Sequence, residues 1–430
     1  MFKYSVIIAL TFIIALGAVA ETDPVEVLQS TASLEQKVEA CRLISISGDV
    51  KAIPVLAALL ADEQLSHMAR YALEPMQEDA AGAALRRALK TTSGKLKAGV
   101  VDSLGMRRDV LAVPALIQLL DDDNSFVVEA SVRSLGRIAV PEGIEALKKH
   151  LVQPDLPYAI MQSLGDGLFA AAEHALAEGN PDSAVPLYDA VYAVETLPVP
   201  IRAAALRGAV LARTPQDGLP LLIEAITGEN AVFYTVSLRT ALEMEDKGNT
   251  ATGIAAVLPG LSADRKIQVM QTIGELGQNS VGPALLKEAG SGIIPVRVAA
   301  LDAAVRVAYA PVLPVLRELL SSEDADLLQA ARRGLAYFPG KEGDAVVMDM
   351  LKSDDVKIRI IAVELISQGA LPTPVELLMK IADGDTDDSI RVAAIKGVKE
   401  YAGIDQMSGL LSHLFDSHSH DEMIAAEEVL

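Results

Sequence analysis

Residues 296–320 read VRVAALDAAVRVAYAPVLPVLRELL, and both phrases in this stretch recur along the chain. The later phrase is an apolar residue, a proline and usually a leucine at the start of a leucine-rich run. Its copies are IPVLAALL from Ile53, VPALIQLL from Val113, VPLYDAVY from Val185, LPLLIEAI from Leu219, GPALLKEA from Gly282, LPVLRELL from Leu313 and TPVELLMK from Thr373. Pro283 and Pro314 are 31 residues apart, and Pro314 and Pro374 are 60 apart. A period near 31 predicts a repeated pair of helices.

The earlier phrase predicts the first helix of each pair. Its copies are IRAAAL from Ile201, VRVAAL from Val296, IRIIAV from Ile358 and IRVAAI from Ile390. Acidic residues before these helices are typical of helix starts, because a carboxylate stabilises the N-terminal end. The repeated arginine could bond to an acid or a carbonyl of the neighbouring unit. We expect first helices to begin near Leu34, Gln64, Gly94, Ser125, Tyr158, Pro200, Ala231, Ala263, Pro295, Ala325, Val356 and Ser389.

The second helices are expected to begin around the prolines, which tolerate the first turn of a helix. Together the two phrases resemble short HEAT-like repeats, and the resemblance covers almost the whole chain. It implies an all-α fold, a right-handed α–α superhelix of about 12 helical pairs. The array is expected to span residues 34–415, with a tetratricopeptide-like pair at 158–195 and the start of a further, incomplete repeat at 416–430. We expect the groove of the solenoid to be lined mainly by second helices.

The first 20 residues predict a signal peptide and therefore an exported protein. Lys3 precedes an apolar run from Val6 to Leu16, and Ala18-Val19-Ala20 is a typical small-residue cleavage site. The apolar run is short for a membrane anchor, so no stable membrane insertion is expected after cleavage. Residues 21–33 form a polar lead-in to the repeats.

Two segments resemble the opening of exported HEAT arrays in envelope proteins of environmental bacteria. They read VEACRLISISGD from Val38 and LSHMARYALEP from Leu65. The resemblance implies a periplasmic or extracellular location. His67, Arg70 and Tyr71 belong to the second segment and are our candidate binding residues, although a single histidine in a helix usually serves packing or surface.

Acidic residues outnumber basic ones by 58 to 37, which gives a formal charge of -21, or -22 without Lys3 of the signal peptide. Such a surface repels phosphate backbones, so no nucleic-acid partner is expected. The sequence contains no Gly-rich phosphate loop of P-loop type, zinc-protease helix signature or nucleophile elbow. It also lacks the His-Glu dipeptides with which the HEAT arrays of deoxyhypusine hydroxylase bind iron. We therefore expect no enzymatic activity and no cofactor.

Histidines near the end of the chain are the candidate metal ligands. His413, His418 and His420 stand beside Asp416 and Asp421, and neutral imidazoles bind zinc or copper. The two-residue step from His418 to His420 indicates a loop, and a polar turn between repeats explains the same residues. The nearby acidic run DGDTDD lacks the glycine and the glutamate of a calcium loop and is typical of helix capping.

Two functional hypotheses follow from the sequence. The first is a non-catalytic scaffold or adaptor of the bacterial cell envelope that binds a protein or peptide partner through the solenoid groove. The alternative is the N-terminal targeting or regulatory array of a larger envelope enzyme, acting on carbohydrate, whose catalytic domain lies beyond Leu430.

Overall fold

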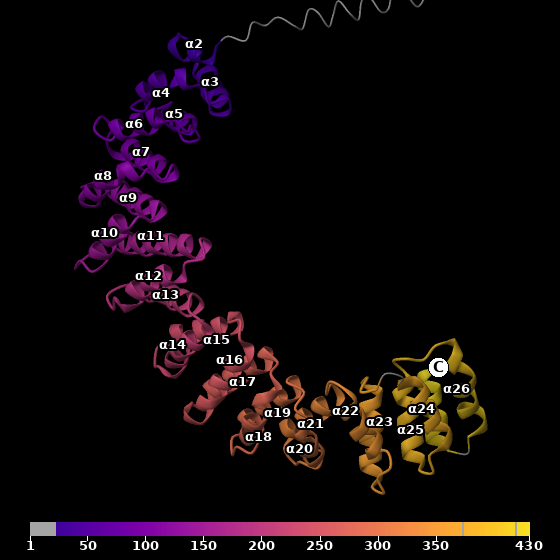
Figure 1. Cartoon of the computed structure of the whole chain (residues 1–430). Coiled ribbons are helices and arrows are strands. Elements are labelled where there is room, and N and C mark those ends of the chain that lie inside the picture. The colour runs from indigo at the N-terminus through magenta and orange to yellow at the C-terminus, as the bar shows by residue number, and fades with distance from the viewer. Residues whose placement is uncertain (1–22, 372–373, 418) are drawn as a thin grey trace, which may run out of the picture. The chain divides into compact units, whose positions relative to one another are not determined.

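The computed structural model describes residues 23–371, 374–417 and 419–430, and every regular element in these ranges is a helix (Figure 1). The all-α prediction is thereby confirmed. The chain divides into two compact units, unit 1 at Met1–Arg213 and unit 2 at Thr214–Leu430. The expected signal peptide, residues 1–20, lies outside the described residues. Within the described ranges, no helix is both long enough and apolar enough to cross a lipid bilayer.

Unit 1 alternates first and second helices of the repeat (Figure 1). Its first helices are α3 (Leu34–Ser47), α5 (Ser66–Leu73), α7 (Gly94–Met106), α9 (Ser125–Ile138), α11 (Tyr158–Ala177) and α13 (Val199–Leu211). Its second helices are α4 (Ile53–Leu59), α6 (Asp79–Ala88), α8 (Val113–Gln118), α10 (Pro141–Leu151) and α12 (Pro181–Ala193). Within the expected polar lead-in, helix α2 (Pro24–Gln29) is capped by Asp23 and buries Leu28.

Unit 2 continues the same alternation. Its first helices are α15 (Ala231–Glu243), α17 (Ala263–Leu276), α19 (Ile294–Arg306), α21 (Ala325–Ala336), α23 (Val356–Ser367), α25 (Asp388–Val398) and α27 (His420–Val429). Its second helices are α14 (Pro215–Thr227), α16 (Lys247–Val257), α18 (Gly282–Ala289), α20 (Leu313–Leu319), α22 (Lys341–Met350), α24 (Pro374–Gly384) and α26 (Ile404–Asp416). Every expected first helix is present, and each begins within two residues of its predicted start.

Polar caps explain why the helix starts could be predicted. The Asn124 side chain accepts a hydrogen bond from the Phe126 amide at 3.1 Å, at the start of α9. The Asp324 side chain accepts from the Leu327 amide at 3.1 Å, at the start of α21. Each cap satisfies an amide that has no partner within the helix.

Proline begins many second helices as expected, but two of the quoted copies differ. Pro54, Pro114 and Pro314 lie in the first turns of α4, α8 and α20. Pro186 and Pro220 instead lie inside α12 and α14. The prediction was wrong for these two helices because each begins at an earlier proline, Pro181 and Pro215. An earlier proline can start a helix one turn sooner, since its fixed φ already suits the first turn.

The first helices of unit 1 lie along the inner edge of its curve, and the second helices lie along the outer edge (Figure 1). The expectation that second helices line the groove is therefore wrong for this unit. Glycines give the physical reason, because they let the backbones of first helices approach closely. A Cβ atom on Gly105 of α7 would lie 2.4 Å from the Ser134 hydroxyl of α9. One on Gly136 of α9 would lie 2.2 Å from the Gly167 carbonyl oxygen of α11.

Arginines of the repeated phrase bond to the backbone just before their own helix. The Arg297 guanidinium donates to the Ala289 carbonyl at 2.9 Å, and that of Arg359 to the Ser353 carbonyl at 2.8 Å. Ala289 ends the preceding second helix, and Ser353 follows one. The expected bond to a carbonyl of the neighbouring unit is confirmed at these positions. It satisfies orphan carbonyls at a helix end, which would otherwise need water.

Candidate functional site

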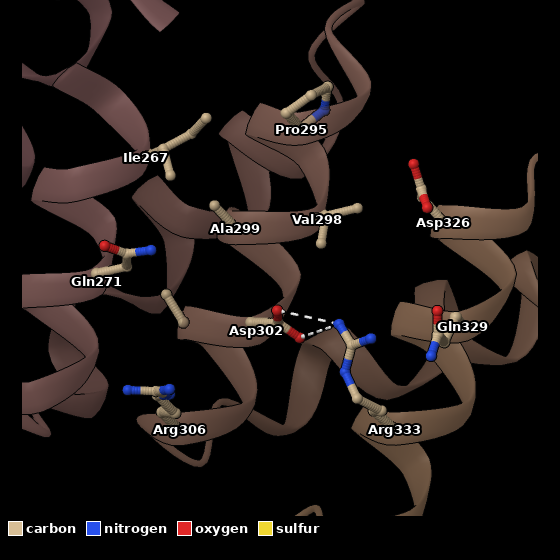
Figure 2. Close-up of a pocket in the computed structure, with 11 residues that line it drawn as sticks. Ile267, Gln271, Pro295, Val298, Ala299, Asp302, Arg306, Asp326, Gln329 and Arg333 are labelled. Atoms are coloured by element: carbon tan, nitrogen blue, oxygen red, sulfur yellow. Dashed lines mark hydrogen bonds and ion pairs between the residues drawn. The ribbon is translucent and has the colours of Figure 1, made fainter. Parts of the chain in front are cut away.

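A groove of about 360 Å³ crosses the first helices α17, α19 and α21 of unit 2 (Figure 2). Its lining residues span one to three turns of each helix, so the walls of the groove are formed by helices and not by loops. Its apolar lining consists of Ile267, Pro295, Val298, Ala299 and Ala303. Its polar lining consists of Gln271, Asp302, Arg306, Asp326, Gln329 and Arg333. A mixture of apolar floor and separated polar groups is typical of a binding cleft.

An ion pair spans the middle of this groove. The Arg333 guanidinium of α21 donates to both Asp302 carboxylate oxygens of α19, at 3.3 and 3.2 Å (Figure 2). The two residues are 31 positions apart, one repeat, so the pair ties equivalent turns of neighbouring helices. Both side chains are about two-fifths exposed, at 40% for Asp302 and 44% for Arg333. Such a pair contributes at most about 1 kcal/mol, so the packing of α19 against α21 sets their register and the pair marks it.

Two other charged side chains line the groove without an ion pair. Arg306 is exposed in the last turn of α19, and its stem lies against Gly274 of α17, with Cδ 3.1 Å from where a Cβ would stand. Asp326 is exposed in the first turn of α21. Throughout the described ranges, no opposite charge lies within 4.0 Å of either group. Both are therefore available to a ligand.

The candidate binding residues from the sequence lie elsewhere, on α5 of unit 1. The Arg70 guanidinium donates to the Gly99 carbonyl of α7 at 3.1 Å and lies 3.5 Å from His67 Nδ1. Burial lowers the pKa of Arg70, while the charges of Glu74 and Asp102 act in the opposite direction. The structure thus brings His67 and Arg70 together on α5, and Arg70 links α5 to α7. Tyr71 is 49% exposed.

The Arg70 tie depends on a missing side chain. A Cβ on Gly99 would lie 2.6 Å from the Arg70 guanidinium carbon, so the arginine occupies the space that another residue would fill. The Ser103 hydroxyl continues the contact by donating to Glu74 at 2.7 Å. These contacts lie within the stack of first helices and hold the Arg70 guanidinium between α5 and α7.

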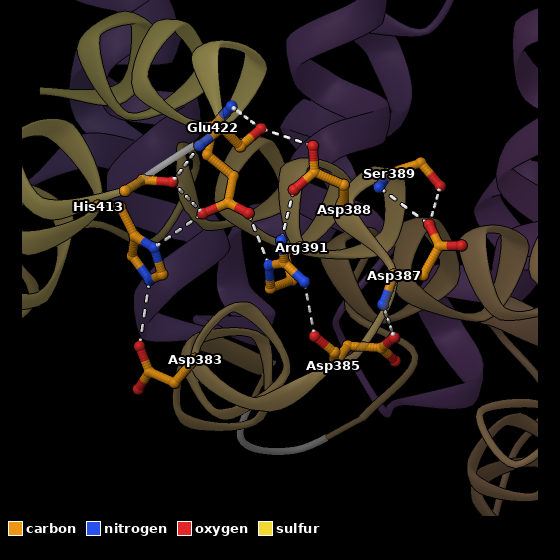
Figure 3. Close-up of polar contacts among 10 residues, drawn as sticks. Asp383, Asp385, Asp387, Asp388, Ser389, Arg391, His413 and Glu422 are labelled. Atoms are coloured by element: carbon orange, nitrogen blue, oxygen red, sulfur yellow. Dashed lines mark hydrogen bonds and ion pairs between the residues drawn. The ribbon is translucent and has the colours of Figure 1, made fainter.

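His413, one of the candidate metal ligands, lies between two carboxylates (Figure 3). Its Nε2 atom is 3.1 Å from Asp383, and its Nδ1 atom is 3.6 Å from the buried carboxylate of Glu422. Arg391 donates to the other Glu422 oxygen at 2.6 Å. The arrangement joins α24, α25, α26 and α27 through one network of charges.

Of the other two candidate ligands, only His420 lies within the described residues. His420 begins α27 and is exposed, and His418 lies outside the described residues. Among the residues that can be described, no three His, Cys, Asp or Glu side chains gather as a metal site would require. The acidic run caps α25, as predicted: Asp387 accepts from the Ser389 amide at 3.0 Å, and its hydrogen bonds with Ser389 lower its pKa.

Comparisons with known proteins agree with the repeat architecture. Residues 82–165 match the family model of HEAT repeats. No curated protein sequence matches the chain. Among solved structures, the chain is similar to the karyopherin Kap121p bound to the extreme C-terminus of the protein phosphatase Cdc14p. The two share 13% identity with a TM-score of 0.53, and the match covers 94% of this chain and 53% of that one. The chain is also similar to Kap121p bound to RanGTP, with 12% identity, a TM-score of 0.52, and coverage of 94% and 52%.

The chain therefore spans about half the length of these karyopherin structures. At such identities the likeness shows the fold alone. Human deoxyhypusine hydroxylase in complex with glycerol shares 19% identity over 67% of this chain and 96% of its own, with a TM-score of 0.27. Together with the matched repeats, the fold defines the class: an all-α solenoid built of HEAT-type helical pairs.

The groove residues were not predicted from the sequence. The one available signal is the spacing of Asp302 and Arg333, opposite charges one repeat apart on first helices. Which of the neighbouring charges stay unpaired depends on helix orientation. For that reason Arg306 and Asp326 could be found only in the structure.

Proposed function

We propose that this chain is a non-catalytic protein-interaction scaffold that binds an extended segment of a partner protein across α17, α19 and α21. The observation that carries the proposal is the groove itself, with its apolar floor, neutral amides and two unpaired charges. The karyopherin structures of similar fold hold a protein segment and a protein, which supports this reading of the solenoid.

The groove chemistry suits the main chain of a peptide. Gln271 and Gln329 each offer a carbonyl oxygen and an NH2 group, which can bond to the peptide groups of an extended segment. Val298 and Ala299 offer apolar surface for its side chains (Figure 2). A volume near the lower end of the roughly 300–1,000 Å³ range of ligand sites suits a few side chains and not a folded domain.

We further propose that the protein acts in the cell envelope, periplasmic or extracellular. The signal-peptide pattern of residues 1–20 supports this location. Expression in a bacterium, followed by fractionation and N-terminal sequencing, is expected to give a periplasmic product beginning at Glu21. A product retained in the cytoplasm with Met1 would contradict the proposal. The alternative of an array within a larger envelope enzyme is tested by reading the gene beyond Leu430.

Selection from a library of random displayed peptides tests the binding function. Peptides bound by the full chain are expected to slow amide hydrogen exchange in α17, α19 and α21. Val298→Arg places a long charged side chain on the groove floor and is expected to weaken binding at least tenfold. Ile46→Arg is a matched control, because Ile46 is an exposed apolar residue of α3 in unit 1. Protection confined to other helices, or undiminished binding by Val298→Arg, would contradict the proposal.

A further inference from the structure

Opposite charges stand at opposite ends of the groove (Figure 2). Arg306 lies at the C-terminal end of α19, and Asp326 lies at the N-terminal end of α21. Between them, Asp302 and Arg333 neutralise each other, so the middle of the groove has no net charge. The groove is therefore positive at one end, neutral in the middle and negative at the other end.

The repeat sets the distance between the two ends. The Asp302–Arg333 pair joins equivalent turns of α19 and α21. Pro295 lies seven residues before Asp302, and Asp326 lies seven residues before Arg333, so Asp326 is level with Pro295. From the level of Pro295 to Arg306 is 11 residues, or about 17 Å along the helix. Neighbouring helix axes are about 9 Å apart, so the two charged positions are separated by about 19 Å on the diagonal.

We propose that the groove binds an extended peptide that carries one acidic and one basic side chain, the acidic one at Arg306 and the basic one at Asp326. An extended chain rises about 3.3 Å per residue and residues an even number apart share a face, so the two side chains stand about six residues apart, with apolar or neutral residues between them. This inference rests on the proposed function, because it requires that the groove binds a partner segment.

The charge order follows from complementarity and not from the overall charge. An acidic protein of net charge -21 favours basic partners at long range. At Arg306, however, a basic side chain would meet a like charge, whereas a carboxylate would gain a charge-assisted hydrogen bond from the guanidinium. Asp326, by contrast, would repel an acidic side chain and attract a basic one. A segment placed in the reverse direction would meet repulsion at both ends.

Two libraries of acetylated and amidated nine-residue peptides test the charge order. One carries glutamate and lysine six positions apart, in either order, and the other carries lysine at both positions, with randomised apolar and neutral residues between them in both libraries. The full chain is expected to enrich the glutamate–lysine library over the dilysine library by about twofold to fivefold. The variant Arg306→Glu, which makes both ends of the groove negative, is expected to reverse this preference.

A second charge reversal serves as the matched control. Arg317 and Asp349 form an exposed ion pair of 3.1 Å on the second helices α20 and α22. The variant Arg317→Glu makes the same change of net charge outside the groove, and it is expected to keep the original preference. Circular dichroism verifies that both variants retain the helical content of the parent chain.

The outcomes separate this inference from the proposed function. Equal capture of both libraries, or an unchanged preference in the groove variant, overturns the charge order. If the captured peptides still protect α17, α19 and α21 from hydrogen exchange, the proposed function stands without it. Capture without protection of these helices, or no capture at all, overturns both.

Discussion

Gly136→Ala tests whether glycine sets the close approach of first helices in unit 1. The added Cβ would lie 2.2 Å from the Gly167 carbonyl oxygen and 2.8 Å from its Cα atom. Real Cβ contacts start above 3 Å, so α9 and α11 must move apart by about 1 Å, and a gap of that size forfeits up to about half of each dispersion contact. The buried side chains Val132, Leu135 and Leu168 lie on these two helices and would lose contacts.

The expected net effect is a loss of about 2 kcal/mol. Overpacking that displaces backbone costs about 3 kcal/mol, and the better helix propensity of alanine returns about 1 kcal/mol. Because a repeat array opens locally, the suitable assay is native-state hydrogen exchange, in which amides of α9 and α11 should exchange about 30-fold faster. Gly384→Ala is the control, since nothing lies within 4 Å of the added atom at the end of α24. Unchanged or slower exchange in α9 and α11 of Gly136→Ala would refute the close-approach argument.

Other substitutions test the ends of the repeat and the buried core. Arg391→Gln removes the ion-pair partner that lies 2.6 Å from Glu422, whose side chain is 5% exposed, and should destabilise α27 by about 3 kcal/mol in urea unfolding. The control Lys396→Gln removes an exposed pair of 3.8 Å and should cost less than about 0.5 kcal/mol. Pro186→Ala restores a helical amide donor inside α12 and should raise its exchange protection by about 1–2 kcal/mol, a smaller or negative change being contrary evidence. Burial raises the pKa of Cys41 to about 11, so about one thiol in a thousand is ionised at pH 8, and iodoacetamide should label it only after unfolding.

Helix positions were predictable because each start is encoded locally. Asn124 and Asp324 stand immediately before their helices and satisfy amides that the helix cannot. The repeat then multiplies the evidence, since a boundary that is ambiguous in one copy is marked by a cap or a proline in another. The interior prolines Pro186 and Pro220 show the limit of this reasoning, because a second proline upstream decided where the helix begins.

For unit 1, the prediction of which helices line the inner edge was wrong, although the sequence holds a signal for it. Gly105, Gly136 and Gly167 are spaced by 31 residues, and in the structure all three lie where first helices meet. A period of small residues on one helix of the pair indicates the side on which backbones approach most closely. The prediction rested on leucine and proline, which indicate burial and helix starts, and neither residue type distinguishes the inner edge from the outer edge.

Binding residues were harder to predict than the fold because a repeat uses most of its polar side chains to hold itself together. Arg70, which stood out in the sequence, is engaged by a carbonyl of the next helix. His413 also stood out and is engaged by two carboxylates. A group serves a ligand only if the stack leaves it without a partner, and this can be decided only from the positions of its neighbours. In an array of this kind, the polar groups left for a partner are those that do not tie one repeat to the next. In the groove across α17, α19 and α21, Asp302 and Arg333 form such a tie, whereas Arg306 and Asp326 remain for a partner.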